Sequence, residues 1–180
     1  AVLMAALLIC GVFVSCGKNS KVAEIKKSGK LVVLTSTGFP PFEYTSNDNG
    51  IVGVDMDICQ AIADELGVEL EIVDMDFAGI PEAIAAGKGH IAAAGMTVTD
   101  ARRQSMDFTE SYLPASQYLL VPVGSGIKIA ADLEGKVIGG QADTTGDSFA
   151  TEKVSAKSIE RYSTPTEAVA ALMGGKVEVV

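Results

Sequence analysis

The sequence predicts an α/β protein built from two lobes, and three observations support this fold class. Apolar, strand-like runs alternate with amphipathic, helix-like segments, which is typical of mostly parallel sheets with flanking helices. The alternation starts again near residue 123, next to the break at Ser125-Gly126, which indicates a second lobe. Hydrophobic residues make up 48% of the chain and charged residues 21%, so the composition is that of a globular protein with a core and not of a disordered one.

The elements of the first lobe follow from hydrophobic periodicity and from the residues that flank each run. Residues 36–44 are expected to form a loop that Pro40-Pro41 stiffens. Asp55 or Asp57 is expected to cap the helix that follows. Strands are expected at 31–35, 68–73, 90–94 and 116–123, a hairpin turn at 46–50, and helices at 55–66, 79–86 and 100–105.

The second lobe follows a crossover that we place near residues 119–124, because the long strand there is the only one followed by a new start of the pattern. We expect the first lobe to span residues 30–120 and the second to span 121–180, after a linker at 17–29 that includes part of a possible first helix. In the second lobe we expect a helical turn at 131–133, strands at 136–139 and 158–162, helices at 145–154 and 165–173, and a further strand that opens at 177.

The first 16 residues have the composition of a secretion signal. Residues 1–14 carry no charge and are too few for a membrane span of about 20 residues. Small residues before Cys16 resemble the lipobox of bacterial lipoproteins, which implies that Cys16 is lipidated and begins the mature protein. An ordinary signal with an incidental cysteine, or a buried apolar helix, are the alternatives.

Cysteine usage and charge exclude several classes of function. Cys10 lies in the signal and Cys59 on the apolar face of a helix, so we expect neither a disulfide framework nor a metal site, and no cofactor. The formal charge of −9 argues against a nucleic-acid partner. The single histidine, His90, stands next to a buried strand, and no phosphate loop, dinucleotide fingerprint or nucleophile elbow accompanies it. We therefore expect a binding protein and not an enzyme.

A candidate anion site lies where a strand of the first lobe passes into a helix. Gly95 allows a ligand to approach the backbone, and Thr97 precedes the helix start, where free N–H groups favour an anion. Arg102 can hold a carboxylate through two parallel hydrogen bonds. The alternative is that Thr99 only caps the helix and that Arg102 is solvated.

A second candidate region joins a strand of the other lobe to its helix. Gln141, Thr144 and Thr145 expose hydroxyl, amide and N–H groups there, so two helix starts could close on one carboxylate. Phe39 and Phe77 stand on loops and could stack against a ligand side chain. For each of them ordinary lobe core is the alternative, and for Phe42 core is the preferred interpretation.

Five motifs in this order resemble the polar amino-acid family of bacterial extracellular solute-binding proteins: GFPPFE at 38–43, GVDMD at 53–57, DFAGIP at 76–81, GMTVTDAR at 95–102 and QADTTG at 141–146. The resemblance runs from about residue 30 to the last residue. It implies the type II periplasmic-binding-protein fold, with two α/β lobes that close over the ligand. It further implies that Arg102, Thr97 and Thr145 bind the ligand α-carboxylate, that the carbonyl of Gly95 accepts from the α-ammonium, and that Phe39 and Phe77 line the side-chain slot.

Two departures from the family pattern qualify these expectations. Several members that bind cationic amino acids carry an acid where this sequence has Ser36, which lowers the expectation of a cationic ligand. The chain also ends before the aspartate that members supply to the α-ammonium and before the return to the first lobe. We therefore expect it to be a fragment, incomplete in both lobes, of a protein of about 250 residues.

The expected function is that of a monomeric receptor that captures a free amino acid and delivers it to an ABC permease of the inner membrane. The lipid anchor would hold it in the periplasm or at the outer face of the cytoplasmic membrane. Two alternatives stay open. One is a dehydratase-type enzyme on the same fold, with His90 or Glu43 as its general acid. The other is the sensor lobe of a signalling receptor.

Overall fold

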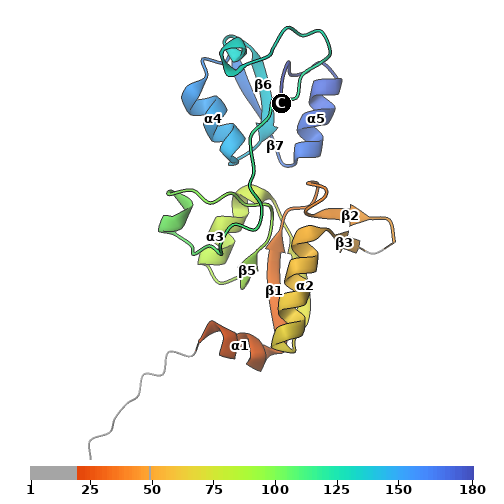
Figure 1. Ribbon diagram of the computed structural model, residues 1–180, viewed down its shortest axis with the longest axis vertical. Helices are drawn as coiled ribbons and strands as arrows, with labels where there is room; N and C mark the ends of the chain where they lie inside the picture. The colour runs from red at the N-terminus through yellow and green to blue at the C-terminus, as the bar shows by residue number, and fades with distance from the viewer. Residues whose placement is uncertain (1–19, 49) are drawn as a thin grey trace, which may run out of the picture.

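The computed structural model describes residues 20–48 and 50–180, and it places them in two lobes stacked along the long axis of the molecule (Figure 1). Strands 30–35 and 137–141 lie in different sheets, as the two-lobe prediction requires. The lobe boundaries that we drew at residues 120 and 121 stay a prediction. Cys16, the expected lipidation site, and Cys10 lie outside the described residues.

The first lobe is organised around a parallel sheet with the strand order β4-β1-β5. Strand β1 (Lys30–Thr35) pairs along its whole length with β4 (Glu69–Asp74), and it pairs with β5 (Ile91–Ala92) on its other side. Leu31, Val33 and Leu34 are fully buried because β1 is the central strand, covered on both faces. The prediction of a buried strand at 31–35 is confirmed, whereas the strand expected at 90–94 is shorter.

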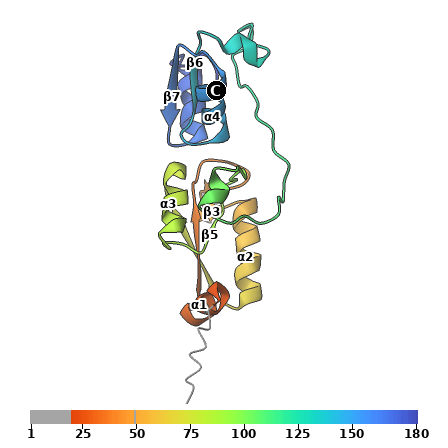
Figure 2. The same ribbon diagram turned by 90° about the vertical axis from the view of Figure 1, so that its left-hand side faces the viewer.

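Helices cover both faces of this sheet (Figure 2). Helices α1 (Lys21–Ser28) and α2 (Val54–Leu66) contribute Ile25, Met56 and Cys59 to one core cluster. On the other face, the 3₁₀ turn η1 (Phe77–Gly79) and helix α3 (Ile80–Ala85) contribute Phe77 and Ile80 to a second cluster. An antiparallel hairpin of β2 (Tyr44–Ser46) and β3 (Gly50–Val52) stands beside them.

The second lobe contains a smaller parallel sheet with a helix on each side of it (Figure 1). Strand β6 (Val137–Gln141) pairs with β7 (Ser158–Tyr162), and Val179 makes a single parallel bridge to Ile138. Helices α4 (Thr145–Lys153) and α5 (Pro165–Met173) flank it, and the 3₁₀ turn η3 (Ala130–Leu133) precedes it. Local signals set these bounds: Thr144 caps α4, and Thr164 caps α5 in a reciprocal pair with Glu167.

The strand expected at 116–123 is absent, and this prediction was wrong. The segment runs as an extended crossover between the lobes (Figure 2), and its backbone pairs only through Leu120, which exchanges hydrogen bonds of 2.8 and 3.0 Å with Val180. Several apolar side chains of the segment, including Tyr118 and Val123, are exposed. Alternating apolar residues predict an extended backbone, but a strand also requires a neighbour with which to pair.

Two smaller expectations were also wrong. In place of the helix at 100–105 there is one 3₁₀ turn, η2 (Arg102–Gln104), and none of its residues is buried. A helix this short is unstable without an apolar face that packs. The cap of α2 is Gly53 and not an aspartate, and its side-chain position is crowded: a Cβ there would lie 2.1 Å from the carbonyl oxygen of Phe42.

Candidate functional site

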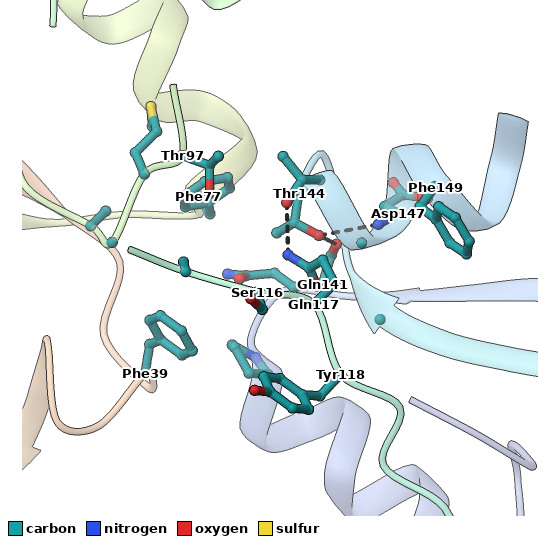
Figure 3. Close-up of a pocket in the computed structure, with 18 of the residues that line it drawn as sticks. Phe39, Phe77, Thr97, Ser116, Gln117, Tyr118, Gln141, Thr144, Asp147 and Phe149 are labelled. Carbon is teal, nitrogen blue, oxygen red and sulfur yellow. Dashed lines mark hydrogen bonds between the residues drawn. The ribbon is translucent and has the colours of Figure 1, made fainter. Parts of the chain in front are cut away.

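A cavity of about 680 Å³ lies between the two lobes and the crossover segment. Residues from all three regions line it, as the close-up in Figure 3 shows. The structure brings every one of the nine predicted ligand-binding residues to this cavity: Ser36, Phe39, Phe77, Gly95, Thr97, Arg102, Gln141, Thr144 and Thr145. The volume lies in the range of small-molecule sites in proteins.

Arg102 is the principal cationic group of the cavity wall. Its Nη1 donates to the carbonyl of Thr97 and its Nη2 to the carbonyl of Asp143, both at 2.8 Å. The guanidinium carbon lies 5.3 Å from the centre of the Phe77 ring, which is buried. A guanidinium has five N–H donors, so these two bonds leave capacity for an anion. Burial lowers the pKa of Arg102, although the side chain stays charged at any physiological pH.

Both interpretations of the 95–102 motif are partly right. The Oγ1 of Thr99 does accept from the N–H of Arg102 at 3.2 Å, although the N-cap position of η2 is Ala101. Arg102 is nevertheless held against an aromatic ring in the cavity and is not freely solvated. The neighbouring Arg103 is exposed and lies over Phe108, with 6.0 Å from its guanidinium carbon to the ring centre.

Phe39 forms another part of the first-lobe wall, away from Arg102. The N–H groups of Gly38 and Phe39 both donate to the carbonyl of Glu43, which closes a tight loop, and the Phe39 ring stacks on Phe42 at 5.3 Å. Gly95 lies directly under this ring: its φ is +55°, and a Cβ there would lie 2.9 Å from a ring carbon of Phe39. Phe42, for which we preferred a core position, also lines the cavity.

The second-lobe wall is a loop whose polar groups are paired internally. Thr144 donates to the carbonyl of Gln141 and accepts from the N–H of Asp147, at 2.9 and 3.3 Å. The side-chain amide of Gln141 donates to the carbonyl of Ser163 at 2.9 Å. The Thr145 hydroxyl accepts from the Gln117 amide at 2.8 Å, so the crossover is fastened to this wall. Gln117, Gln141 and Thr144 lie close together in Figure 3.

Asp147 fixes the shape of this loop. It is buried, and it accepts from the N–H of Asp143 at 3.1 Å and from Nε of Arg161 at 2.9 Å. Burial alone would raise the pKa of Asp147, but the hydrogen bonds with Arg161 and Asp143 lower it on balance. Asp143 adopts a left-handed conformation with a φ of 59°, which turns its carbonyl toward Arg102. The two lobes are therefore bridged by Arg102, and also by the Thr166 hydroxyl, which donates to the carbonyl of Gly38 at 3.0 Å.

Sequence reasoning named Glu43 as a candidate general acid and Asp55 as a possible cap, but it did not predict that the two acids are buried together beneath the first-lobe wall. Glu43 and Asp55 are each 1% exposed. Asp55 accepts from the N–H of Gly95 and from the hydroxyl of Tyr112, both at 2.8 Å. We had interpreted Asp55 as a helix cap because it stands in the first turn of a helix, and nothing in the local sequence separates the two roles. Gln117 was missed because its segment was predicted to be a strand.

Glu43, one of the two candidate general acids of the enzyme alternative, lines the cavity. His90, a candidate general acid, does not line it; its Nδ1 accepts from the N–H of Val32 at 2.9 Å, which is a structural contact. Within residues 20–48 and 50–180 no group of three or more metal-ligating side chains is found. Within the same residues no helix is long and apolar enough to cross a membrane.

A fold of two α/β lobes with a polar cavity between them defines a class of ligand-binding proteins, and comparison with known proteins identifies the family. The profile of "Bacterial extracellular solute-binding proteins, family 3" matches residues 31–173. The chain therefore belongs to this family of polar amino-acid-binding proteins with the type II periplasmic fold. This confirms the family and the fold class that the sequence motifs predicted.

Two curated relatives illustrate the similarity. The arginine-binding extracellular protein ArtP of Bacillus subtilis is 35% identical over 139 residues, which cover 77% of this chain and 54% of ArtP. A probable histidine-binding protein of Campylobacter jejuni is 31% identical over 176 residues, which cover 94% of this chain and 68% of that protein. The chain thus spans 54% and 68% of the length of these two relatives.

Solved structures show the same fold. The arginine-bound form of truncated ArgBP from T. maritima superposes with a TM-score of 0.82 at 36% identity, covering 87% of this chain and 74% of that one. The ancestral amino acid-binding protein AncCDT-1, a precursor of cyclohexadienyl dehydratase, superposes with a TM-score of 0.84 at 32% identity, covering 89% and 72%. The latter shows that an enzyme has descended from a binding protein of this fold.

Proposed function

We propose that the chain binds a free polar amino acid in the cavity between its lobes and serves as the receptor of an ABC importer. One observation carries the proposal: a guanidinium with unused donors lies in the cavity, against the ring of Phe77 and within hydrogen-bonding distance of the second lobe. A carboxylate is the ligand group that such a guanidinium binds best.

The second wall offers a complementary set of donors to the same carboxylate. Helix α4 begins at the cavity, so the N–H groups of its first turn are close to it. We assign the α-carboxylate to Arg102, Thr97 and Thr145, and the α-ammonium to the carbonyl of Gly95. Phe39 and Phe77 then flank the ligand side chain. Ser36 and Gln141 line the cavity as well and are assigned to polar parts of the ligand.

The named relatives make arginine and histidine the first ligands to test. The chain has Ser36, buried at the cavity wall, where several binders of cationic amino acids have an acid. A cationic side chain would lack that partner here. Arginine and an uncharged polar amino acid such as glutamine therefore belong in the same assay.

The proposal includes the cellular setting inferred from the sequence. We propose a lipid anchor on Cys16 and a place outside the cytoplasmic membrane, next to the permease that receives the amino acid. We also propose that the protein acts as a monomer and is not an enzyme. In support of the latter, Glu43, the candidate general acid that lines the cavity, is fully buried and paired with Asp55, which leaves it poorly placed to protonate a substrate.

A thermal-shift screen against free amino acids tests the proposal. A ligand that binds only the folded protein stabilises it by about 2.7 kcal/mol at a concentration of 100 Kd, so the correct amino acid should raise the Tm by several degrees. The matched control is the amide of the same amino acid, which lacks the carboxylate and should raise the Tm far less. If no amino acid raises the Tm, or if the amide is as effective, the proposal is wrong.

A further inference from the structure

Two buried acids are held side by side under the amino-acid cavity by a fixed backbone arrangement. Glu43 ends the loop that carries Phe39, and Asp55 stands in the first turn of α2. The N–H of Val54 donates to the carbonyl of Pro41 at 3.0 Å, and the N–H of Asp55 donates to the carbonyl of Phe42 at 3.1 Å. These bonds join the loop to the helix start, so the two carboxyl groups cannot easily separate.

Asp55 connects this pair to the ligand site. One of its oxygens accepts from the N–H of Gly95 and the other from the hydroxyl of Tyr112, both at 2.8 Å. Gly95 lies under the Phe39 ring, in a conformation that few other residues adopt. The bond from its N–H to Asp55 therefore fixes the peptide plane that enters Gly95, next to the Gly95 carbonyl that is assigned to the ligand.

Glu43 is in a different position, because one of its oxygens has no partner. Oε2 is buried, and no hydrogen-bond donor among the described residues reaches it. An ionised carboxylate buried without donors is costly, whereas a protonated carboxyl can use the same oxygen as a donor. Asp55, an acceptor, is the adjacent carboxyl.

The surroundings of Glu43 all favour the protonated form. The titratable groups that face the pair are Asp55 and Cys59 on α2 and Tyr112 on the crossover, and none of them is a cation. Burial, the charge of Asp55 and a hydrogen bond with Asp55 raise the pKa of Glu43 to about 9. Burial and Asp55 also raise the pKa of Cys59, to about 11, and that of Tyr112.

We propose that Glu43 is a positioning residue of the amino-acid site: it carries a proton, donates it to Asp55, and so allows a single negative charge to hold the Gly95 amide in place. The part that concerns the ligand rests on the function proposed above, whereas the shared proton does not. When Glu43 loses its proton, two adjacent carboxylates repel each other in a buried site, and the Asp55–Gly95 bond weakens. The site should therefore lose order and affinity at alkaline pH.

The direct test follows the Gly95 amide by ¹H–¹⁵N NMR in the ligand-free protein between pH 6 and 10.5. We expect its resonance to titrate with an inflection near pH 9, because its acceptor changes when Glu43 ionises. In Glu43→Gln, which keeps the shape of a protonated glutamate, the inflection should disappear. The matched control is Glu65→Gln, an exposed carboxyl on α2, which should leave the inflection in place.

A second variant keeps the test decisive if Glu43→Gln fails to fold. Tyr112→Phe removes one donor from Asp55 and leaves both carboxyls in place. The ionised pair then lacks one stabilising donor, so Glu43 should lose its proton less readily and the Gly95 inflection should move to higher pH. A Gly95 resonance without an inflection in the wild type, or an inflection unchanged in both variants, would overturn the proposal.

Ligand affinity gives the functional readout. Once an amino acid that binds is known, we expect its Kd for the wild type to rise by up to about tenfold for each pH unit above the pKa of Glu43, relative to its Kd for Glu43→Gln at the same pH. The ratio removes the effect of the ligand's own amino group, which is common to both proteins. A constant ratio would overturn the positioning role. If no amino acid binds at all, the proposed function fails, while the NMR titration still tests the shared proton.

Discussion

The two walls of the cavity each contain a buried carboxyl group, and the two groups are held in opposite ways. Asp147 in the second lobe lies against Arg161, with 2.9 Å between Oδ2 and Nε, and its pKa is lowered. Glu43 in the first lobe lies against another acid, and its pKa is raised to about 9. The partner, and not burial alone, therefore decides whether a buried acid carries a charge or a proton.

The difference extends to what each wall can offer a ligand. The second wall presents neutral hydroxyl and N–H groups around a loop in which Asp147 already pairs with the backbone of Asp143 and with Thr144. The first wall presents the cation of Arg102 and the backbone of Gly95, which rests on the Glu43–Asp55 pair. The first wall is therefore expected to supply most of the binding energy, and the second wall most of the shape.

The largest effect is expected at Arg102. Arg102→Ala should weaken amino-acid binding by about 30-fold or more, because an unpaired carboxylate in a partly dry cavity costs about 2–5 kcal/mol. Arg102→Lys should recover only part of the loss, since an ammonium lacks the planar fork. Calorimetry measures both. Arg103→Ala is the control, because Arg103 is exposed and lies over Phe108. If Arg103→Ala abolished amino-acid binding while Arg102→Ala left binding unchanged, the assignment of the two arginines would be reversed.

The raised pKa of Glu43 predicts that the free energy of unfolding falls as the pH rises. The folded protein holds a proton that the unfolded chain releases, so this contribution is complete below the unfolded pKa of 4.5 and is lost as the pH rises toward about 9. Each pH unit in that window should lower the free energy of unfolding by up to ~1.4 kcal/mol. Urea unfolding of Glu43→Gln should show a flatter pH profile than the wild type. If the free energy of unfolding fell with pH equally in both proteins, Glu43 would not be the group that holds the buried proton.

The lowered pKa of Asp147 predicts the opposite trend for the second lobe. Its contribution is present above the unfolded pKa of 3.8 and is lost as the pH falls below that value toward the lower folded pKa. Asp147→Asn should cost about 1–3 kcal/mol at neutral pH, because the bonds to Arg161 and Asp143 are weakened. Acid unfolding followed by circular dichroism tests this against Glu152→Gln, an exposed change on the same helix. If Asp147→Asn and the wild type unfolded over the same acidic pH range with equal loss of stability, the comparison of the two acids would be contradicted.

The smallest effect is expected at Thr145. Thr145→Val keeps the shape of the side chain and removes one neutral hydrogen-bonding group, worth about 1 kcal/mol or about fivefold in Kd. Thr166→Val, which removes the contact to Gly38 but leaves the α4 start unchanged, separates ligand binding from bridging of the lobes. A Thr145→Val loss as large as that of Arg102→Ala would mean that the second wall, and not the first, dominates binding.

Most of the fold could be predicted from the sequence, because most of its signals are local. The bounds of α5 match the prediction, since Thr164, Pro165 and Glu167 form a complete start signal in four residues. Strand β7 also begins and ends where expected. The crossover at 116–123 could not be predicted, because whether an extended segment becomes a strand depends on a partner far away in the chain.

The candidate site shows the same division. The nine residues predicted to bind ligand all line the cavity, since they stand in motifs at the ends of strands. The Glu43–Asp55 pair was missed, because it depends on burial and on the contact between a loop and the start of α2. Gly53 allows that contact, but the sequence around it does not indicate that the loop packs against its backbone.

The central claim is that Arg102 binds the carboxylate of a free amino acid. A double-mutant cycle tests it most directly: calorimetry of the wild type and of Arg102→Ala, each with the amino acid that binds and with its amide. We predict that the amide binds the wild type about 30-fold or more weakly than the acid does, and that Arg102→Ala hardly distinguishes the two ligands. If Arg102→Ala still prefers the acid by the same factor, Arg102 does not hold the carboxylate.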